Sequence, residues 1–476
     1  MLKTKIVCTL GPSSNSPEMI EKMISSGMNV ARLNFSHGTH EGHAEVIRRI
    51  KAARDKLGVP VAIMLDTKGP EIRLCKFKGG EAELRTGSTF TLTTDGEDGD
   101  DTHVSVTYKE LPTQVKPNVR ILLNDGALEL TVRETTPDSV VCTVTCGGTI
   151  KDGKGVNIPN VHLDMPYLSE RDKSDLLFGI ENDVDLISAS FVRSPDDVIK
   201  MRKYLDYNGG HDLKIISKIE NNEGVENFDA ILHESDGIMV ARGDMGVEID
   251  FERLPGLQKR FIKRCYQAGK MVITATQMLE SMIEHPTPTR AEISDVANAV
   301  FDGTSAIMLS GETAVGKYPL HAVSAMAKIA HQAEHDAFES GTYNSISYDI
   351  DNSDITGALC DAACTTAADL NARAIICLTT SGKSARRMSK FRPHQPIVAA
   401  TPKVKTFHQL ALSWGVYPVL AIKQNNTEKL FQHAIDCAKT LDLVEKGDLV
   451  VISGGEPVGA SGNTNMIKAV TVAGND

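Results

Sequence analysis

The chain has 476 residues, of which 41% are hydrophobic and 24% charged, and its net charge is −11. Its acids and bases are interspersed and form no basic stripe, which argues against a nucleic-acid partner, and no apolar run reaches the roughly 18 residues that a membrane span needs. The length suggests a globular protein of about two to four domains, and nine scattered cysteines favour reduced thiols in the cytoplasm.

Eight short apolar segments, each ending in a polar or charged residue, predict the strands of a (β/α)₈ TIM barrel. In a barrel of parallel strands these ends meet on one face, where such enzymes keep their chemistry. Helices are expected between the first segments, from Pro17 to Ser25 and over 40–56. The eight segments are 5–10, 28–35, 61–68, 184–192, 214–220, 237–244, 271–277 and 305–312.

Residues 71–166 interrupt this pattern with short, alternating, β-rich segments, which predict an all-β lid domain inserted over the mouth of the barrel. Asn124-Asp125-Gly126 predicts a tight turn within the lid. Gly69-Pro70 and Met165-Pro166 bracket the insertion and are expected hinges. The expected lid strands are 89–94, 103–108, 119–123, 127–132 and 139–146.

Residues 344–476 alternate helices and strands again, after a barrel domain made of 1–70 and 167–343. This alternation predicts a C-terminal α/β domain with an open parallel sheet and helices on both faces. The whole chain is therefore expected to be an α/β protein. The expected strands are 373–380, 396–401, 416–422, 448–454 and 467–472, and the helices cover 355–371 or begin at Ser384, Val404 and Thr427.

Two carboxylates, Glu220 and Asp244, end neighbouring barrel segments, each two positions after a cation, Lys218 or Arg242. Residues two apart on a strand share a face, so each cation and carboxylate should point the same way. Carboxylates from adjacent strands could hold a hard cation such as Mg²⁺. The alternative is that each carboxylate pairs with its neighbouring cation, and the residues alone leave both interpretations open.

Four side chains are candidates for catalysis. Lys218 could stabilise a developing oxyanion or form a Schiff base, and Glu220 beside it favours the charged, electrostatic role. Arg32 and Arg73 could clamp a phosphate or a carboxylate, although a lone arginine is more often a solvated surface residue. Thr276 offers a hydroxyl at the end of the seventh segment, or else it caps the segment that follows.

Oxygen-bearing side chains also gather at the ends of the second and third segments. Asn34, Ser36, Asp66 and Thr67 offer several oxygens but one formal charge, which suits a monovalent cation.

Some apparent motifs predict no site. Residues 311–317 resemble a phosphate-binding loop, but Tyr318 stands where a Ser or Thr is required. His37, His40 and His43 are spaced by three, yet no neighbouring acid or cysteine completes a zinc site. Cys360 and Cys364 fall on one helical face and are expected in the core.

One segment of the last domain suits a phosphate group, because it follows a strand, opens a helix and carries hydroxyls and a lysine. It lies at the carboxyl end of a predicted parallel strand, where open α/β sheets bind ligands. The alternative is an ordinary capped turn. The residues are Thr379, Thr380, Ser381, Gly382, Lys383 and Ser384.

Six segments carry long and ordered motifs: 28–38 (MNVARLNFSHG), 65–73 (LDTKGPEIR), 216–221 (ISKIEN), 239–244 (MVARGD), 275–279 (ATQML) and 308–312 (MLSGE). Together they resemble the signatures of the pyruvate kinase family, of the bacterial type, and the resemblance runs from end to end of the chain. It implies transfer of phosphate from phosphoenolpyruvate to ADP, giving pyruvate and ATP, as the final step of glycolysis in the cytoplasm.

The resemblance also implies a homotetramer, a divalent cofactor (Mg²⁺ or Mn²⁺), K⁺, and an activating sugar phosphate or nucleotide bound at 379–384. Lys218 would bridge the transferring phosphate and stabilise the enolate, and Thr276 would orient the path by which the enolate is protonated. The remaining implied roles are phosphoryl binding by Arg32 and Arg73, divalent-cation binding by Glu220 and Asp244, K⁺ binding by Asn34, Ser36, Asp66 and the carbonyl of Thr67, and substrate-carboxylate binding by the backbone of Ala241, Arg242 and Gly243.

Two other functions compete with this one. A Schiff-base aldolase would use Lys218 as its nucleophile, but two carboxylates suited to a metal count against it. A regulatory paralogue without catalysis is disfavoured, because every residue of the implied catalytic set is present.

Overall fold

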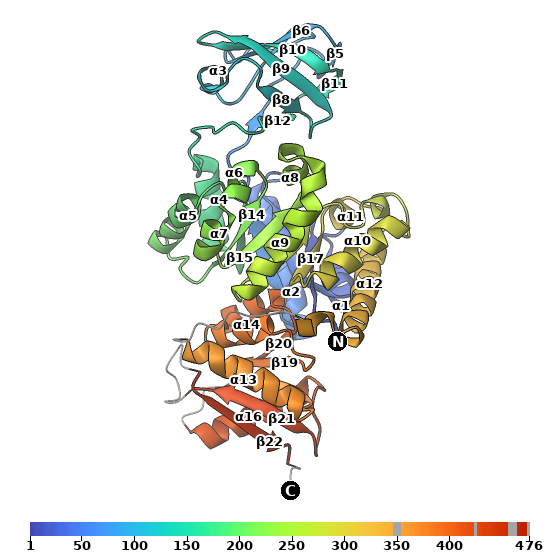
Figure 1. Ribbon diagram of the computed structural model, residues 1–476, viewed down its shortest axis with the longest axis vertical. Helices are drawn as coiled ribbons and strands as arrows, with labels where there is room; N and C mark the ends of the chain where they lie inside the picture. The colour runs from blue at the N-terminus through green and yellow to red at the C-terminus, as the bar shows by residue number, and fades with distance from the viewer. Residues whose placement is uncertain (346–353, 423–425, 456–463, 474–476) are drawn as a thin grey trace.

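The computed structural model describes residues 1–345, 354–422, 426–455 and 464–473. These residues form three stacked units, with the lid at one end, the barrel in the middle and the C-terminal domain at the other end (Figure 1). Each unit has its own cluster of buried hydrophobic side chains. Among the described residues no helix is long and apolar enough to cross a membrane.

The predicted barrel is confirmed. Its parallel strands close in the order β1-β17-β16-β15-β14-β13-β3-β2, so the first strand pairs with both the second and the last. A second layer of apolar side chains, including Met64, Ile216 and Met239, fills the interior. The strands are β1 (Lys5–Thr9), β2 (Met28–Asn34), β3 (Ala62–Asp66), β13 (Leu186–Ala189), β14 (Lys214–Ile219), β15 (Gly237–Ala241), β16 (Met271–Ala275) and β17 (Ala306–Leu309).

Helices surround this barrel, and their ends follow local chemistry. Ser16 caps α1 by accepting from the backbone of Met19, and Ser169 with Asp172 forms a reciprocal capping box at α4. The α-helices are α1 (Pro17–Ser25), α2 (His40–Leu57), α4 (Glu170–Glu181), α5 (Pro195–Tyr207), α6 (Asn222–Glu226), α7 (Phe228–Glu234), α8 (Arg242–Glu248), α9 (Leu254–Gln267), α10 (Arg290–Phe301), α11 (Gly311–Ala314) and α12 (Pro319–Glu339). Short 3₁₀ turns are η1 (Phe251–Arg253), η2 (Glu280–Ile283) and η3 (Thr342–Ser345).

The inserted lid is all-β apart from the one-turn helix α3 (Leu111–Gln114). Asn124 and Asp125 adopt positive φ values of 51° and 56°, as a tight turn requires. The sequence missed β4, β5, β11 and β12, which form by pairing β4 with β12 and β5 with β11, segments that lie far apart along the chain. The strands are β4 (Ile72–Arg73), β5 (Glu81–Leu84), β6 (Thr89–Thr93), β7 (His103–Ser105), β8 (Arg120–Leu123), β9 (Leu128–Thr135), β10 (Ser139–Cys146), β11 (Gly148–Lys151) and β12 (Gly155–Asn157).

The C-terminal sheet has the order β20-β19-β18-β21-β22 and carries helices on both faces. The expectation of a wholly parallel sheet is wrong for its last strand, since β22 runs antiparallel to β21. An antiparallel neighbour needs no crossover helix, and no helical pattern separates these strands. The elements are α13 (Ile355–Asp369), β18 (Ala374–Leu378), α14 (Lys383–Lys390), β19 (Ile397–Thr401), α15 (Val404–Gln409), η4 (Leu410–Leu412), β20 (Val416–Leu420), α16 (Thr427–Thr440), β21 (Leu449–Gly454) and β22 (Met466–Thr471).

The barrel and the C-terminal domain meet at the amino end of β1. The ammonium of Lys5 donates to the carbonyl of Val416 at 2.8 Å, and that of Lys3 donates to the carbonyl of Gln395 at 3.3 Å. Trp414 is fully buried at this junction. The opposite, carboxyl ends of the barrel strands face the lid (Figure 1).

Candidate active site

A buried network of charged side chains lies at the carboxyl ends of β2, β3 and β14. The guanidinium of Arg32 donates from Nε to Asp66 Oδ2 at 2.5 Å and from Nη1 to the hydroxyl of Thr9 at 2.8 Å. The ammonium of Lys218 lies 3.5 Å from Asp66 Oδ1 and donates to the hydroxyl of Ser190 at 2.9 Å. Asp66 therefore joins the two cations that the sequence placed on separate strands.

Asp66 and the cations beside it hold one another in the ionised state. Burial alone would raise the pKa of Asp66, but Arg32 and Lys218 keep it below its usual value. Burial alone would lower the pKa of Lys218, but the carboxylates of Asp66 and Glu220 raise it instead. A lysine with a raised pKa stays protonated, which suits an electrostatic role and opposes Schiff-base chemistry.

Glu220 is completely buried beside Lys218, with 2.8 Å between Nζ and Oε1. Its other oxygen accepts the backbone N–H of Phe191, a residue with a positive φ of 52°, at 2.5 Å. Burial raises the pKa of Glu220 to about 8, Lys218 opposes the shift, and Asp244 adds to it. A carboxylate that burial makes costly to ionise gains from a nearby cation, so Glu220 fits a metal ligand as well as an ion pair.

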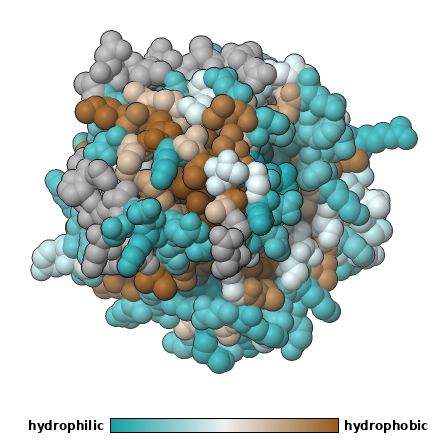
Figure 2. Space-filling view, turned by 90° about the horizontal axis from the view of Figure 1, so that it is seen from below, coloured by the Kyte–Doolittle hydropathy of each residue, from teal (hydrophilic) through white to brown (hydrophobic). Residues whose placement is uncertain are grey.

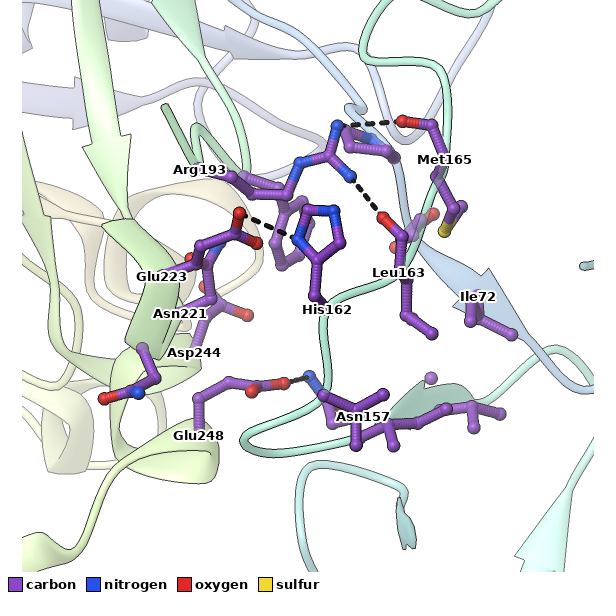
Figure 3. A pocket seen from close by; sticks show the side chains of 18 of the residues that line it. Ile72, Asn157, His162, Leu163, Met165, Arg193, Asn221, Glu223, Asp244 and Glu248 are labelled. Carbon is purple, nitrogen blue, oxygen red and sulfur yellow. Dashed lines mark hydrogen bonds and ion pairs between the residues drawn. The ribbon is translucent and has the colours of Figure 1, made fainter. Parts of the chain in front are cut away.

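The structure corrects the expected geometry around Asp244. Strand β15 ends at Ala241, so Arg242 and Asp244 lie in the first turn of α8 rather than two apart on a strand. Arg242 turns to Asp295 at 2.7 Å and to the carbonyl of Thr276, and within the described residues Asp244 forms no ion pair. The alternative interpretation, an ion pair between Arg242 and Asp244, is therefore wrong, and Asp244 lines the cleft between barrel and lid (Figure 3).

Thr276 has a strained backbone, with a φ of 70° that a β-branched residue rarely adopts. Its hydroxyl accepts the backbone N–H of Gly243 at 2.7 Å and donates to the carbonyl of Ala275. The alternative interpretation, that Thr276 caps the segment that follows it, is wrong. Its hydroxyl instead caps the first turn of α8, the helix that follows the neighbouring strand β15. Strain of this kind is commonly found at functional sites.

The four candidate ligands for a monovalent cation lie at the carboxyl ends of the adjacent strands β2 and β3: Asn34 and Asp66 are the last strand residues, and Ser36 and Thr67 follow them. Asn34 pairs directly with Asp66 in the register of β2 and β3. The amide oxygen of Asn34 accepts the N–H of Ser36 at 3.0 Å, and the carbonyl of Thr67 accepts the hydroxyl of Ser190 at 2.6 Å. This donor set of amide, carboxylate and carbonyl oxygens fits K⁺.

Arg73 does not join the Arg32–Lys218 network. It lies in β4 of the lid and pairs with Glu71 at 2.6 Å, and its Nη1 donates to the carbonyl of Gly153 at 2.7 Å. Arg73 nevertheless lines a cleft of about 800 Å³ between lid and barrel, together with residues that the sequence did not single out. Those residues include Asn157, His162, Arg193, Glu223 and Glu248 (Figure 3). No sequence pattern marked them: Asn157 lies in β12, Glu223 in α6 and Glu248 in α8, and the other two lie in loops.

The motifs that the sequence set aside form no site within the described residues. Residues 311–314 form the short helix α11, with no loop that could cradle a phosphate chain. An acid does stand beside the histidines, since His40 lies 2.6 Å from Asp175, but His43 bonds to the carbonyl of His37 instead. These contacts leave two ligands, too few for zinc.

Cys360 and Cys364 are buried in α13, as expected of core thiols.

The candidate phosphate segment forms a turn from β18 into α14. Gly382 takes a positive φ of 77°, and its N–H donates to the hydroxyl of Thr379 at 3.0 Å. The hydroxyl of Ser384 contacts that of Thr464 at 2.6 Å. Lys383 is exposed and forms no ion pair among the described residues. The turn is thus capped internally, while its lysine is left available to a ligand.

Comparison with known proteins gives a consistent result. Residues 1–323 match the family model "Pyruvate kinase, barrel domain", and residues 357–470 match "Pyruvate kinase, alpha/beta domain". The chain is 49% identical to a pyruvate kinase of Clostridium acetobutylicum, over 99% of this chain and 100% of the relative. It is 48% identical to one of Clostridium perfringens (98% and 99%) and 46% identical to one of Geobacillus stearothermophilus (99% and 80%).

Proposed function

Since the chain belongs to the pyruvate kinase family, and so transfers phosphate from phosphoenolpyruvate to ADP to give pyruvate and ATP, we propose which of its residues perform each part of that reaction. The observation that carries the proposal is the buried network of Arg32, Asp66, Lys218 and Glu220 at the mouth of the barrel. Phosphoryl transfer needs positioning and charge neutralisation more than covalent chemistry, and this network supplies both.

Lys218 is the central cation of the proposed mechanism. Its protonated ammonium bridges the migrating phosphoryl group and the enolate oxygen, where negative charge develops. Arg32 binds the phosphoryl group from the other side and is held in place by Asp66 and Thr9. Because Asp66 contacts both cations, it fixes the distance between them.

Glu220 and Asp244 are the proposed ligands of the divalent cation, Mg²⁺ or Mn²⁺. Such an ion, when bound, neutralises charge on the substrate carboxylate and on the developing enolate. Glu220 is oriented for this role by the N–H of Phe191, and Asp244 by its place at the start of α8. Asn34, Ser36, Asp66 and the carbonyl of Thr67 would hold K⁺ beside them.

The substrate carboxylate is received at the first turn of α8, formed by Ala241, Arg242, Gly243 and Asp244. Backbone N–H groups in a first turn lack helical partners, which suits an anion. The hydroxyl of Thr276 already bonds to Gly243 there, so it is placed to guide a proton to the enolate. Arg242 itself supports this turn through Asp295 rather than through a direct charge on the substrate.

ADP occupies the cleft between the barrel and the lid, and Arg73 contributes to its phosphate binding from the lid side. Closure of the lid would exclude water and keep the phosphoryl group from hydrolysis. A homotetramer is proposed as the working form. The face seen from the C-terminal end carries apolar side chains that suit subunit contact (Figure 2). Ile355 and Ile422 of this domain are each 70% exposed.

The activity is tested by measuring ATP formation from phosphoenolpyruvate and ADP with Mg²⁺, with and without K⁺. The account predicts activity that requires Mg²⁺ and increases with K⁺. Borohydride trapping with a carbonyl substrate tests the aldolase alternative, and covalent capture of the substrate on Lys218 would support that alternative instead.

A phosphorylated effector is proposed to bind at residues 379–384. Lys383 is exposed at the start of α14 and far from the barrel mouth, so Lys383→Ala should abolish activation while leaving basal kcat unchanged. Coupling of this kind is typically about 1–3 kcal/mol, which corresponds to a roughly 5- to 150-fold shift in apparent affinity for phosphoenolpyruvate. Substrate curves with and without sugar phosphates and nucleoside monophosphates would measure the shift. A parental response in Lys383→Ala would contradict the assignment.

A further inference from the structure

The polypeptide that returns from the lid to the barrel, residues 157–165, makes side-chain contacts with the barrel at three places (Figure 3). Asn157 donates to Glu248 at 2.9 Å, and His162 lies 2.9 Å from Glu223. At the third place, Arg193 donates from Nη1 to the carbonyl of Leu163 at 3.0 Å and from Nη2 to the carbonyl of Met165 at 2.8 Å. The guanidinium of Arg193 therefore forms two hydrogen bonds to the backbone of the hinge.

The backbone at this point makes a tight three-residue turn, because the N–H of Met165 bonds to the carbonyl of Leu163 at 2.9 Å. Asp164 is at the apex, and its backbone groups face the lid. Its N–H donates to Gln114 at 2.9 Å, and its carbonyl accepts the hydroxyl of Tyr108 at 3.1 Å. The ends of the turn are thus held by the barrel and its apex by the lid.

Arg193 is itself fixed in position by neighbouring residues of the barrel. Its side chain is 16% exposed, and the carboxylate of the buried Asp197 accepts both its backbone N–H at 3.1 Å and its Nε at 3.4 Å. Asn227 donates to its carbonyl at 2.9 Å. The loop after β13 that carries Arg193 also carries Phe191, whose N–H orients Glu220. The support and the proposed metal ligand are therefore tied to the same short loop.

We propose that Arg193 is a positioning residue for phosphoryl transfer: it fixes the turn 163–165 as the pivot of the lid and so sets where the lid's half of the ADP cleft lies over the barrel. This inference rests on the proposed role of the lid. The contact of His162 with Glu223 can release as the lid turns, because the side chain of His162 is 71% exposed. The two hydrogen bonds from Arg193 to the backbone carbonyls of the turn persist through that motion.

The test compares Arg193→Met and Arg193→Lys with the parent by two measurements. Hydrogen exchange of a peptide covering 157–166 should be faster in Arg193→Met, because the turn loses its support. The KM for ADP should rise about 10-fold or more, while the affinity for phosphoenolpyruvate, measured by thermal shift without ADP, should be unchanged. Lysine keeps the charge but not the two-pronged geometry, so Arg193→Lys should fall between the parent and Arg193→Met.

Arg202→Met is the matched control, because Arg202 also bonds a backbone carbonyl (Leu213, 2.8 Å) and a carboxylate (Asp236, 2.8 Å) but contacts no lid residue among those described. It should leave both measurements unchanged. Parental exchange and a parental KM for ADP in the Arg193 variants would overturn the proposal, as would equal effects in Arg202→Met. If Arg193→Met fails to fold, Arg193→Lys decides. If the parent formed no pyruvate, the proposed function would fail, and the exchange comparison would still decide the pivot.

Discussion

At the scale of single residues, the site depends on charges that are buried together. Lys218 and Glu220 were both recognisable from the sequence, because they stand two apart at the carboxyl end of β14, where alternate residues share a face. Asp244 was selected for the wrong geometric reason, since its strand ends three residues earlier and a helix begins. Ser190 falls within the predicted strand 184–192, but its bonds to Lys218 and Asp66 depend on side-chain packing that no sequence pattern reveals.

The proposed metal ligands can be tested one at a time. Glu220→Gln and Asp244→Asn each remove a charged oxygen, so each should raise the Mg²⁺ concentration for half-maximal activity by about 10-fold or more. Glu226→Gln is the control, because Glu226 lines the same cleft and accepts a hydrogen bond from Asn222. Unchanged Mg²⁺ titrations in both variants would place the metal elsewhere.

At the scale of elements, the long periodic segments were predicted well and the short ones were not. All eight barrel strands were found, since each is an apolar run between helices of regular period. Strand β4 has two residues, Ile72 and Arg73, and exists because it pairs with β12 rather than because of its own pattern. Arg73 consequently lies in the lid and pairs with Glu71. The sequence analysis did not predict this ion pair, although the two residues are only two positions apart.

The lid is expected to be needed for ADP and not for the stability of the barrel, because its apolar core is separate from that of the barrel. Deletion of 71–166 with the ends joined should leave a folded protein that binds phosphoenolpyruvate but forms no ATP. Circular dichroism, thermal shift with phosphoenolpyruvate and the coupled ATP assay would show this. Full ATP formation by the shortened protein would exclude the lid from the site.

At the scale of the whole molecule, the amino end of the barrel is joined to the C-terminal domain by polar contacts, some of them buried. Lys405 lies 2.6 Å from Asp183, and the side chain of Gln409 donates to the carbonyls of Asp185 and Asp212. His408 is buried beside them. None of these contacts could be read from the sequence, because they join segments about 200 residues apart whose docking depends on the complete surfaces.

This junction should make the stability of the protein sensitive to acid. Burial, with Arg54 and Lys405 nearby, lowers the pKa of His408 from 6.5 to about 3. The unfolded chain therefore binds a proton at His408 that the folded protein does not, so the contribution of His408 to stability is fully present above pH 6.5 and is lost as the pH falls towards 3. The melting temperature of His408→Gln should fall less between pH 7 and pH 4 than that of the parent.

The exposed His211 provides the comparison, and His211→Gln should keep the parental pH dependence. An unchanged pH dependence in His408→Gln would mean that other groups control the acid response of the junction.

The most direct test of the account is the kcat of Lys218→Met for pyruvate formation, beside that of Lys214→Met. Both lysines lie in β14, but Lys214 is at the opposite end of the strand and pairs with Asp236 at 3.2 Å. The account predicts that kcat falls at least ~10²-fold in Lys218→Met, because the developing enolate loses its cation, and stays near the parental value in Lys214→Met. A folded Lys218→Met enzyme with near-parental kcat would contradict the central claim.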